Sequence, residues 1–133
     1  MTEAVVDTSI WVSAELGRTL DSSRLPDVLR VSVVTLAELQ AGVLAAGDAA
    51  SASARMRTLE AAQSTEPLPV DAAVAREWAL LRVEIARAGR RVNVNVNDLW
   101  IAATARANRL AVVTQDDDFD PVADLGLVEV IKV

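Results

Sequence analysis

Short runs of apolar, mostly β-branched residues alternate along this chain with longer stretches whose apolar residues recur at helical spacing. The strand candidates are EAVV before Asp7, RVSVVT at 30–35, LAVVT at 110–114 and LVEVIKV at 127–133. The helical stretches cover about 9–16, 19–30, 35–46, 52–63, 71–89 and the residues from Asp98 onward, and QDDDFDP at 115–121 is expected to be a loop. Strands that alternate with helices favour a layered fold with parallel strand pairing. The pattern therefore predicts an α/β fold with a mostly parallel central sheet and helices on both faces.

The length and the apolar content of the chain suit one compact unit. With 133 residues, of which 52% are hydrophobic, the chain can bury a substantial core, and we expect a single domain over 1–133. No apolar run reaches the length of a membrane span, and residues 1–10 lack the charged start and apolar core of a signal peptide. These features predict a cytoplasmic protein with no membrane partner.

The chain contains neither histidine nor cysteine. Their absence removes the usual general base, the Ser-His-Asp and Cys-His pairings, the commonest zinc ligand and every thiolate site. Hydrolytic chemistry would have to rest on carboxylates, hydroxyls, arginines, the one lysine, or a hard metal ion held by oxygen atoms.

Acidic residues stand where the predicted strands pass into helices or loops. They are Asp7, Glu38, Asp98 and the run Asp116–Asp118. Because ligands of open parallel sheets bind at the carboxyl ends of the strands, we expect these acids to converge at one edge of the sheet. Converging carboxylates repel one another, and a divalent cation relieves that repulsion well. Oxygen ligands without His or Cys suit Mg²⁺ or Mn²⁺.

Each acid also has a structural explanation of its own. Asp7 could cap a helix, and Thr35 with Glu38 fits the capping-box pattern in TLAE. Asn97 could cap the helix that Asp98 begins, with the Asp98 carboxylate complementing the helix dipole. The three consecutive aspartates could form a solvated turn. Taken singly these explanations suffice, but a shared metal site accounts better for all of the acids together.

Two hydroxyl residues and an uneven charge distribution accompany the acids. Ser9 and Thr114 lie beside Asp7 and the aspartate run, where they could orient carboxylates or water. The net charge is −6, which argues against a uniformly basic coat for nucleic acid. Residues 76–109 are nevertheless rich in arginine. Either a phosphate substrate or ordinary solvated helix faces would explain that excess.

Four segments carry a family resemblance. VVDTSIWV, TLAELQAG, NDLWIAATA and VVTQDDDF occur in the order and approximate spacing typical of PIN domains, and the short chain resembles the VapC-type toxins of bacterial toxin–antitoxin pairs. The resemblance implies a Mg²⁺- or Mn²⁺-dependent endoribonuclease, usually a homodimer, which a VapB-type antitoxin silences.

The same resemblance implies particular site residues. By position, Asp7, Glu38 and Asp98 match the three central acids, and the fourth falls at Asp116, with Asp118 near enough to share or replace its role. Ser9 matches the small hydroxyl residue after the first acid, and Thr114 matches the hydroxyl residue before the last acidic loop.

Two other functions compete with this hypothesis. A haloacid-dehalogenase-like phosphatase generally has a second Asp two residues after its nucleophile, where this chain has Ser9, and a positioned lysine, whereas the only lysine is Lys132. The second alternative is a PIN-like module that binds RNA or a partner without catalysis.

The tryptophans are expected to be core or interface anchors, since their sequence context is helical. They are Trp11, Trp78 and Trp100. The apolar residues of the helices at 35–63 predict a partner surface. They are Leu36, Leu39, Val43, Leu44, Met56 and Leu59.

Overall fold

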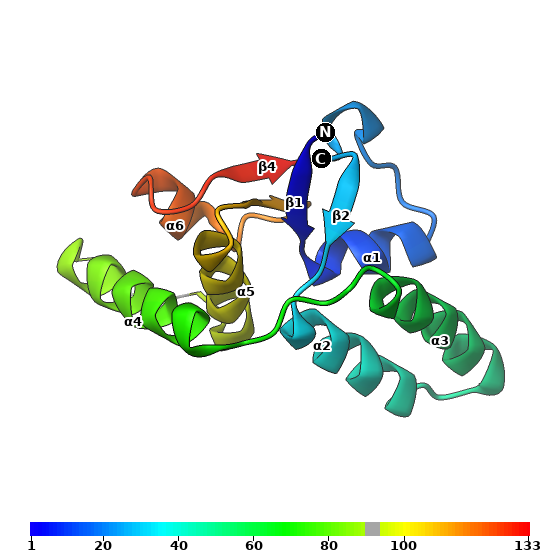
Figure 1. The fold of residues 1–133 in the computed structure, drawn as a ribbon. Helices are drawn as coiled ribbons and strands as arrows, with labels where there is room; N and C mark the ends of the chain where they lie inside the picture. Colours follow the sequence, from blue (N-terminus) through cyan, green and yellow to red (C-terminus); the bar gives the residue numbers. More distant parts are fainter. Residues whose placement is uncertain (90–93) are drawn as a thin grey trace.

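The computed structural model describes residues 1–89 and 94–133. Within them, a four-stranded sheet has the order β2-β1-β3-β4, and every neighbouring pair is parallel (Figure 1). The strands are β1 (Glu3–Val6), β2 (Val28–Arg30), β3 (Ala111–Thr114) and β4 (Val130–Lys132). This arrangement confirms the predicted α/β class and the parallel sheet.

The two central strands end side by side. Val6 of β1 is paired with Val113 of β3, and the amide of Asp7 donates to the Val113 carbonyl at 2.9 Å. The chain therefore leaves β1 at Asp7 and leaves β3 at Thr114 on the same edge of the sheet. This register brings together segments that lie more than a hundred residues apart in the sequence.

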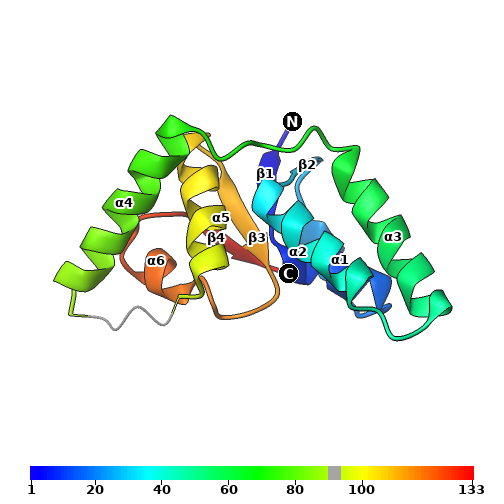
Figure 2. The ribbon, with the colours of Figure 1, turned by 90° about the horizontal axis from the view of Figure 1, so that it is seen from below.

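Helices pack on both faces of the sheet. They are α1 (Thr8–Glu15), α2 (Val33–Leu44), α3 (Ala49–Gln63), α4 (Ala72–Arg87), α5 (Val96–Ala107) and α6 (Asp120–Asp124), with a short 3₁₀ helix at Ser22–Arg24. Figure 2 shows α4, α5 and α6 gathered on one side and α1, α2 and α3 on the other. Within the described residues, no helix has the length and apolar character needed to cross a bilayer.

The side chains of β1 alternate between two apolar clusters. Val5 joins Leu81 and Leu99 of α4 and α5, whereas Ala4 and Val6 join Ile10 of α1 on the opposite face. All three β1 residues are at most 2% exposed. This burial on both faces explains why the strand reads as a continuous apolar run and not as an alternating pattern. The central strands are therefore held rigidly under the edge where they end.

The tryptophans serve packing. Trp78 and Trp100 stack with ring centroids 4.9 Å apart and lie against the cluster formed by α4 and α5. Trp11 is partly buried between the clusters around α1 and α3. This placement agrees with the expected anchor role.

The expected helix at 19–30 and the expected strand at 30–35 are both wrong. A 3₁₀ turn is followed by β2, because Pro26 disfavours helical backbone at Leu25, which is extended. Ser32 then caps α2 by accepting from the Val34 amide at 3.1 Å, so that Val33 and Val34 are helical. Capping and packing override the β propensity of these valines.

The start of α5 also differs from expectation. Its cap is Asn95, whose side chain accepts from the Asn97 amide at 2.8 Å, so Asn97 is already helical and is not the cap. The stretch Val92–Asn97 alternates apolar and polar residues in the sequence, but the chain is helical from Val96, and Val92 and Asn93 lie outside the described residues. Asp98 occupies the third helical position of α5.

Other boundaries follow from caps. Asp71 caps α4 by accepting from the Val74 amide at 3.0 Å, as expected. Asp48 caps α3, which therefore begins at Ala49 and not near residue 52. The expected loop at 115–121 runs into α6, whose first turn contains a proline.

Candidate active site at the carboxyl edge of the sheet

A cavity of about 420 Å³ lies where β1 and β3 end. Its acidic lining consists of Asp7, Glu38, Asp98, Asp116 and Asp118, and its other lining residues include Thr8, Ser9, Arg18, Asn95 and Gln115. The fold thus brings five of the six acids singled out from the sequence into one pocket, from four separate segments of the chain, and leaves out only Asp117. The pocket is lined mainly by side chains with oxygen atoms, and it is open to solvent.

Asp7 has two functions, since it caps α1 and faces the pocket. One carboxylate oxygen accepts from the Ser9 amide at 2.9 Å, and the other accepts from the Ser9 hydroxyl at 2.9 Å and from the Thr114 hydroxyl. The residue is 3% exposed. Burial raises the pKa of Asp7, although the bonds from Thr114 and Ser9 act in the opposite direction. The capping explanation is correct and does not compete with a site role.

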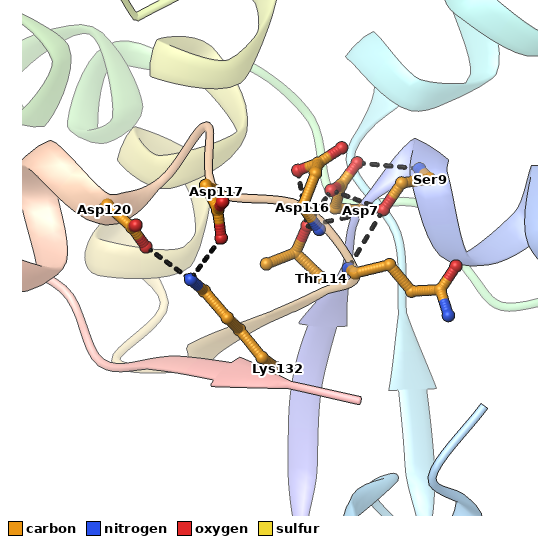
Figure 3. A network of polar contacts seen from close by, with 8 residues as sticks. Asp7, Ser9, Thr114, Asp116, Asp117, Asp120 and Lys132 are labelled. Atoms are coloured by element: carbon orange, nitrogen blue, oxygen red, sulfur yellow. Dashed lines mark hydrogen bonds and ion pairs between the residues drawn. The ribbon is translucent and has the colours of Figure 1, made fainter.

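Thr114 lies beneath the pocket and joins two of the acids (Figure 3). Its fully buried hydroxyl contacts Asp7 and lies 2.9 Å from a carboxylate oxygen of Asp116. A threonine hydroxyl carries one hydrogen, so it can donate to only one of these carboxylates at a time. The Ser9 hydroxyl is 3.3 Å from it. The two hydroxyl residues therefore orient carboxylates, as the sequence analysis allowed.

Glu38 lies in the second turn of α2 and faces the pocket. The capping box with Thr35 is wrong, because Ser32 is the cap and Thr35 is a buried residue of the helix. The Glu38 carboxylate instead accepts from the Thr8 hydroxyl at 2.8 Å. Glu38 therefore does not cap α2, and its hydrogen bond from Thr8 holds its carboxylate at the side of the pocket.

Asp98 has the most perturbed carboxyl group of the pocket. Burial, the largest single cause, and repulsion by other carboxylates together raise its pKa to about 7. The repelling carboxylates are, in decreasing order of effect, those of Asp7, Asp118, Glu38 and Asp116. The helix dipole of α5 favours the charged form only modestly. The site therefore carries like charge that a bound cation would relieve.

The three consecutive aspartates separate in the structure. Asp117 turns away from the pocket toward Lys132, whose ammonium group lies 2.5 Å from Asp117 and 2.9 Å from Asp120 (Figure 3). Asp116 and Asp118 both line the pocket. Burial raises the pKa of Asp118, with further contributions from Asp116 and Asp117. Either residue can supply the fourth acid.

The donor set fits a hard divalent ion that keeps part of its water shell. Within residues 1–89 and 94–133, no three acidic side chains form a ready-made cage for an ion. Mg²⁺ does not require such a cage, because it usually binds through one or two carboxylates together with water and substrate phosphate. A set of carboxylates spread over an open pocket suits that mode of binding.

Sequence analysis missed several residues at this pocket. Gln115 donates from its amide to the Thr19 carbonyl at 3.2 Å and accepts from the Ser13 hydroxyl. Arg18 lies just after the helix predicted over about 9–16, and it also lines the pocket although no sequence pattern pointed to it. Among the described residues, the arginine-rich segment supplies no arginine to the pocket, and its Arg106 instead pairs with Glu77 at 2.6 Å. Arg90 and Arg91 of that segment lie outside the described residues.

Comparison with known proteins defines the class. The family model described as the PIN domain matches residues 4–125, and the chain belongs to the PIN-domain family. Ribonuclease VapC5 of Mycobacterium tuberculosis (strain ATCC 25618 / H37Rv) is 49% identical over 129 residues, which are 97% of this chain and 94% of the relative. Ribonuclease VapC4 of the same strain is 43% identical over 131 residues, or 98% and 96% of the two chains.

A solved structure shares the whole fold. The crystal structure of VapBC-5, a member of the VapBC family of toxin-antitoxin systems from Mycobacterium tuberculosis, matches with a TM-score of 0.89 and 45% identity. The match covers 100% of both chains. The similarity to VapC proteins therefore extends over all four segments that carry the acids.

Proposed function

We propose that this chain is a Mg²⁺- or Mn²⁺-dependent endoribonuclease that acts as the toxin of a VapBC-type pair. The observation that carries the proposal is the pocket itself, in which five carboxylates meet and in which burial, together with their mutual repulsion, raises the pKa of Asp98 to about 7. The names of the relatives, Ribonuclease VapC5 and Ribonuclease VapC4, support RNA as the substrate.

The pocket residues divide the work in a simple way. Asp7, Asp98, Glu38 and either Asp116 or Asp118 would hold the cation, which when bound supplies an activated water and charge stabilisation for displacement at phosphorus. Ser9 and Thr114 orient the Asp7 and Asp116 carboxylates through their hydroxyl groups. Thr8 orients Glu38 in the same manner.

The partners follow from the proposed role. The VapBC-5 match supports a VapB-type antitoxin as the partner, and we propose the cytoplasm as the compartment in which the pair acts. The surface expected on α2 and α3 is only partly free, because Leu39 and Leu59 belong to the core, whereas Leu44 is 79% and Met56 38% exposed. We propose a homodimer, which light scattering at micromolar concentration would show. A protein that stays monomeric on concentration would refute the dimer.

The experiment that tests the activity is cleavage of single-stranded or looped RNA by the purified protein with Mg²⁺ or Mn²⁺. We expect cleavage that stops with excess EDTA and that is lost in Asp7→Asn. The matched control is Asp48→Asn, which also removes one aspartate charge but lies outside the pocket and keeps a competent helix cap. Activity that persists in EDTA, or that requires zinc, would contradict the proposal.

The two alternatives are separated by the same data. A binding module without catalysis would bind RNA but leave it intact. Against this alternative, each position that the PIN resemblance assigns to an acid holds an acid that lines the pocket. A phosphatase of the haloacid-dehalogenase type needs a lysine at its site. The only lysine, Lys132, is paired with Asp117 and Asp120 and does not line the pocket.

A further inference from the structure

Arg18 is held at the rim of the acidic pocket by the turn that ends α1. The Gly17 amide donates to the Ala14 carbonyl at 3.2 Å, and the Arg18 amide donates to the Ser13 carbonyl at 2.9 Å. These two bonds form a Schellman motif, with Gly17 in the left-handed conformation at φ +70°. The backbone of Arg18 is therefore fixed relative to Asp7, which begins the same helix.

Arg18 is the one basic residue that lines the pocket in the described part of the chain. Its side chain is exposed, and its guanidinium forms no ion pair or hydrogen bond with any described residue. It does not neutralise the acids, because the charges that shift the pKa of Asp98 are all carboxylates. The Arg18 guanidinium is therefore free to bind an anion that enters the pocket.

The substrate of the proposed function is a polyanion, and the protein opposes it electrostatically. The net charge is −6, and the pocket concentrates five acids. A metal ion bound by those acids would bind the phosphate that reacts. The neighbouring phosphates of the RNA would still face an acidic surface. A guanidinium can bind a phosphate with two parallel hydrogen bonds, which makes arginine well suited to this contact.

We propose that Arg18 binds a phosphate of the RNA next to the one that is cleaved, and so positions the strand across the pocket. This inference rests on the proposed ribonuclease activity. It makes Arg18 a substrate-positioning residue whose loss weakens RNA binding and leaves the chemical step largely unchanged. An ordinary solvated arginine would affect neither.

The test compares Arg18→Gln with the wild type in steady-state cleavage of a labelled single-stranded RNA, with Mg²⁺ or Mn²⁺ and at several salt concentrations. We expect KM to rise about tenfold with kcat nearly unchanged, because one charge-assisted contact is lost from an exposed site. The dependence of log(kcat/KM) on log[salt] should become shallower by about 0.7, the value for one phosphate contact on a single strand. Arg18→Lys should recover part of the loss.

The matched control is Arg76→Ala on α4, which removes one exposed positive charge outside the pocket. Thermal melts of both variants should match the wild type, since neither arginine side chain has a described partner. Arg18→Gln with the same KM and salt slope as Arg76→Ala would overturn the role of Arg18 while the ribonuclease activity stands. A fall in kcat with KM unchanged would also overturn it. A wild type that cleaves no RNA would overturn the proposed function itself.

Discussion

Replacing Asp98 by asparagine separates the electrostatic role of this residue from its place in a helix. In the metal-free protein, burial of the Asp98 carboxylate and its repulsion by Asp7, Asp118, Glu38 and Asp116 together raise its pKa to about 7. The unfolded chain does not share that pKa. Asparagine keeps the size and polarity of the side chain and removes the charge, so it should relieve the repulsion.

The magnitude can be worked from the pKa. A rise from 3.8 to about 7 corresponds to at most ~4 kcal/mol of unfolding free energy. The side chain is half-buried, and solvent screening reduces this to about 1–2 kcal/mol. Losing the charge in the first turn of α5 costs about 0.3–1 kcal/mol through the helix dipole. Burial and repulsion of the charge together outweigh the helix dipole, so Asp98→Asn should be more stable by about 1 kcal/mol, or roughly 3 °C in Tm.

The sign of the pH dependence follows from the raised pKa. Between about pH 4 and pH 7 the folded protein holds a proton on Asp98 that the unfolded chain has released. The contribution of Asp98 to the free energy of unfolding therefore becomes less favourable to the folded state as the pH rises. The advantage of Asp98→Asn should therefore be full near pH 8 and vanish near pH 4, where both states of the wild type are protonated. Taking the difference between the two proteins cancels the other titrating groups.

The assay is a set of thermal melts of both proteins in EDTA across this pH range, repeated with millimolar Mg²⁺ or Mn²⁺. A ligand at a hundred times its Kd stabilises the folded state by about 2.7 kcal/mol, and Asp98→Asn should gain much less than the wild type. A variant that is less stable at every pH and keeps the full response to metal would refute the reasoning. It would leave Asp98 only as the partner of a helix dipole.

Four further substitutions test the pocket and its surroundings. Glu38→Gln should leave the melting temperature nearly unchanged, because its amide oxygen can still accept from Thr8 and it does not cap α2, while RNA cleavage falls by orders of magnitude; near-normal cleavage would contradict a site role. Asp116→Asn should lose more of the Mn²⁺-induced rise in Tm than Asp118→Asn, since only Asp116 is oriented by the Thr114 hydroxyl, and the reverse order would make Asp118 the fourth ligand. Lys132→Met should lower the urea-unfolding free energy by less than about 1 kcal/mol, because its ion pairs are exposed to solvent; a much larger loss would show that they hold the acidic loop.

Chemistry and fold class could be predicted from the sequence because both depend on local patterns. The alternation of strand and helix signals indicated a parallel sheet, and parallel strands place their carboxyl ends at one edge. That rule predicted the meeting of Asp7 with Asp116, and the register of β1 and β3 places their segments side by side. The absence of His and Cys left only oxygen ligands, and these predict a hard divalent cation.

Boundaries and roles that depend on competing caps could not be predicted. RVSVVT looks like a strand by propensity, yet the Ser32 cap and the packing of α2 make most of it helical. The same competition moved the cap of α5 from Asn97 to Asn95. Because Ser32 caps α2, Glu38 does not have the capping role that the four-residue pattern TLAE predicted. Such a short pattern does not show where the helix begins.

The amino-acid sequence by itself determined which groups are available: carboxylates and hydroxyls at strand ends, with one lysine and no imidazole or thiol. Only the tertiary structure decided how they are used. It turned Asp117 toward Lys132 while Asp116 and Asp118 face the pocket, and it placed Arg18 at the rim. The physical reason is that the direction of a side chain and the repulsion between charges depend on distances in space, which neighbours in the sequence do not set.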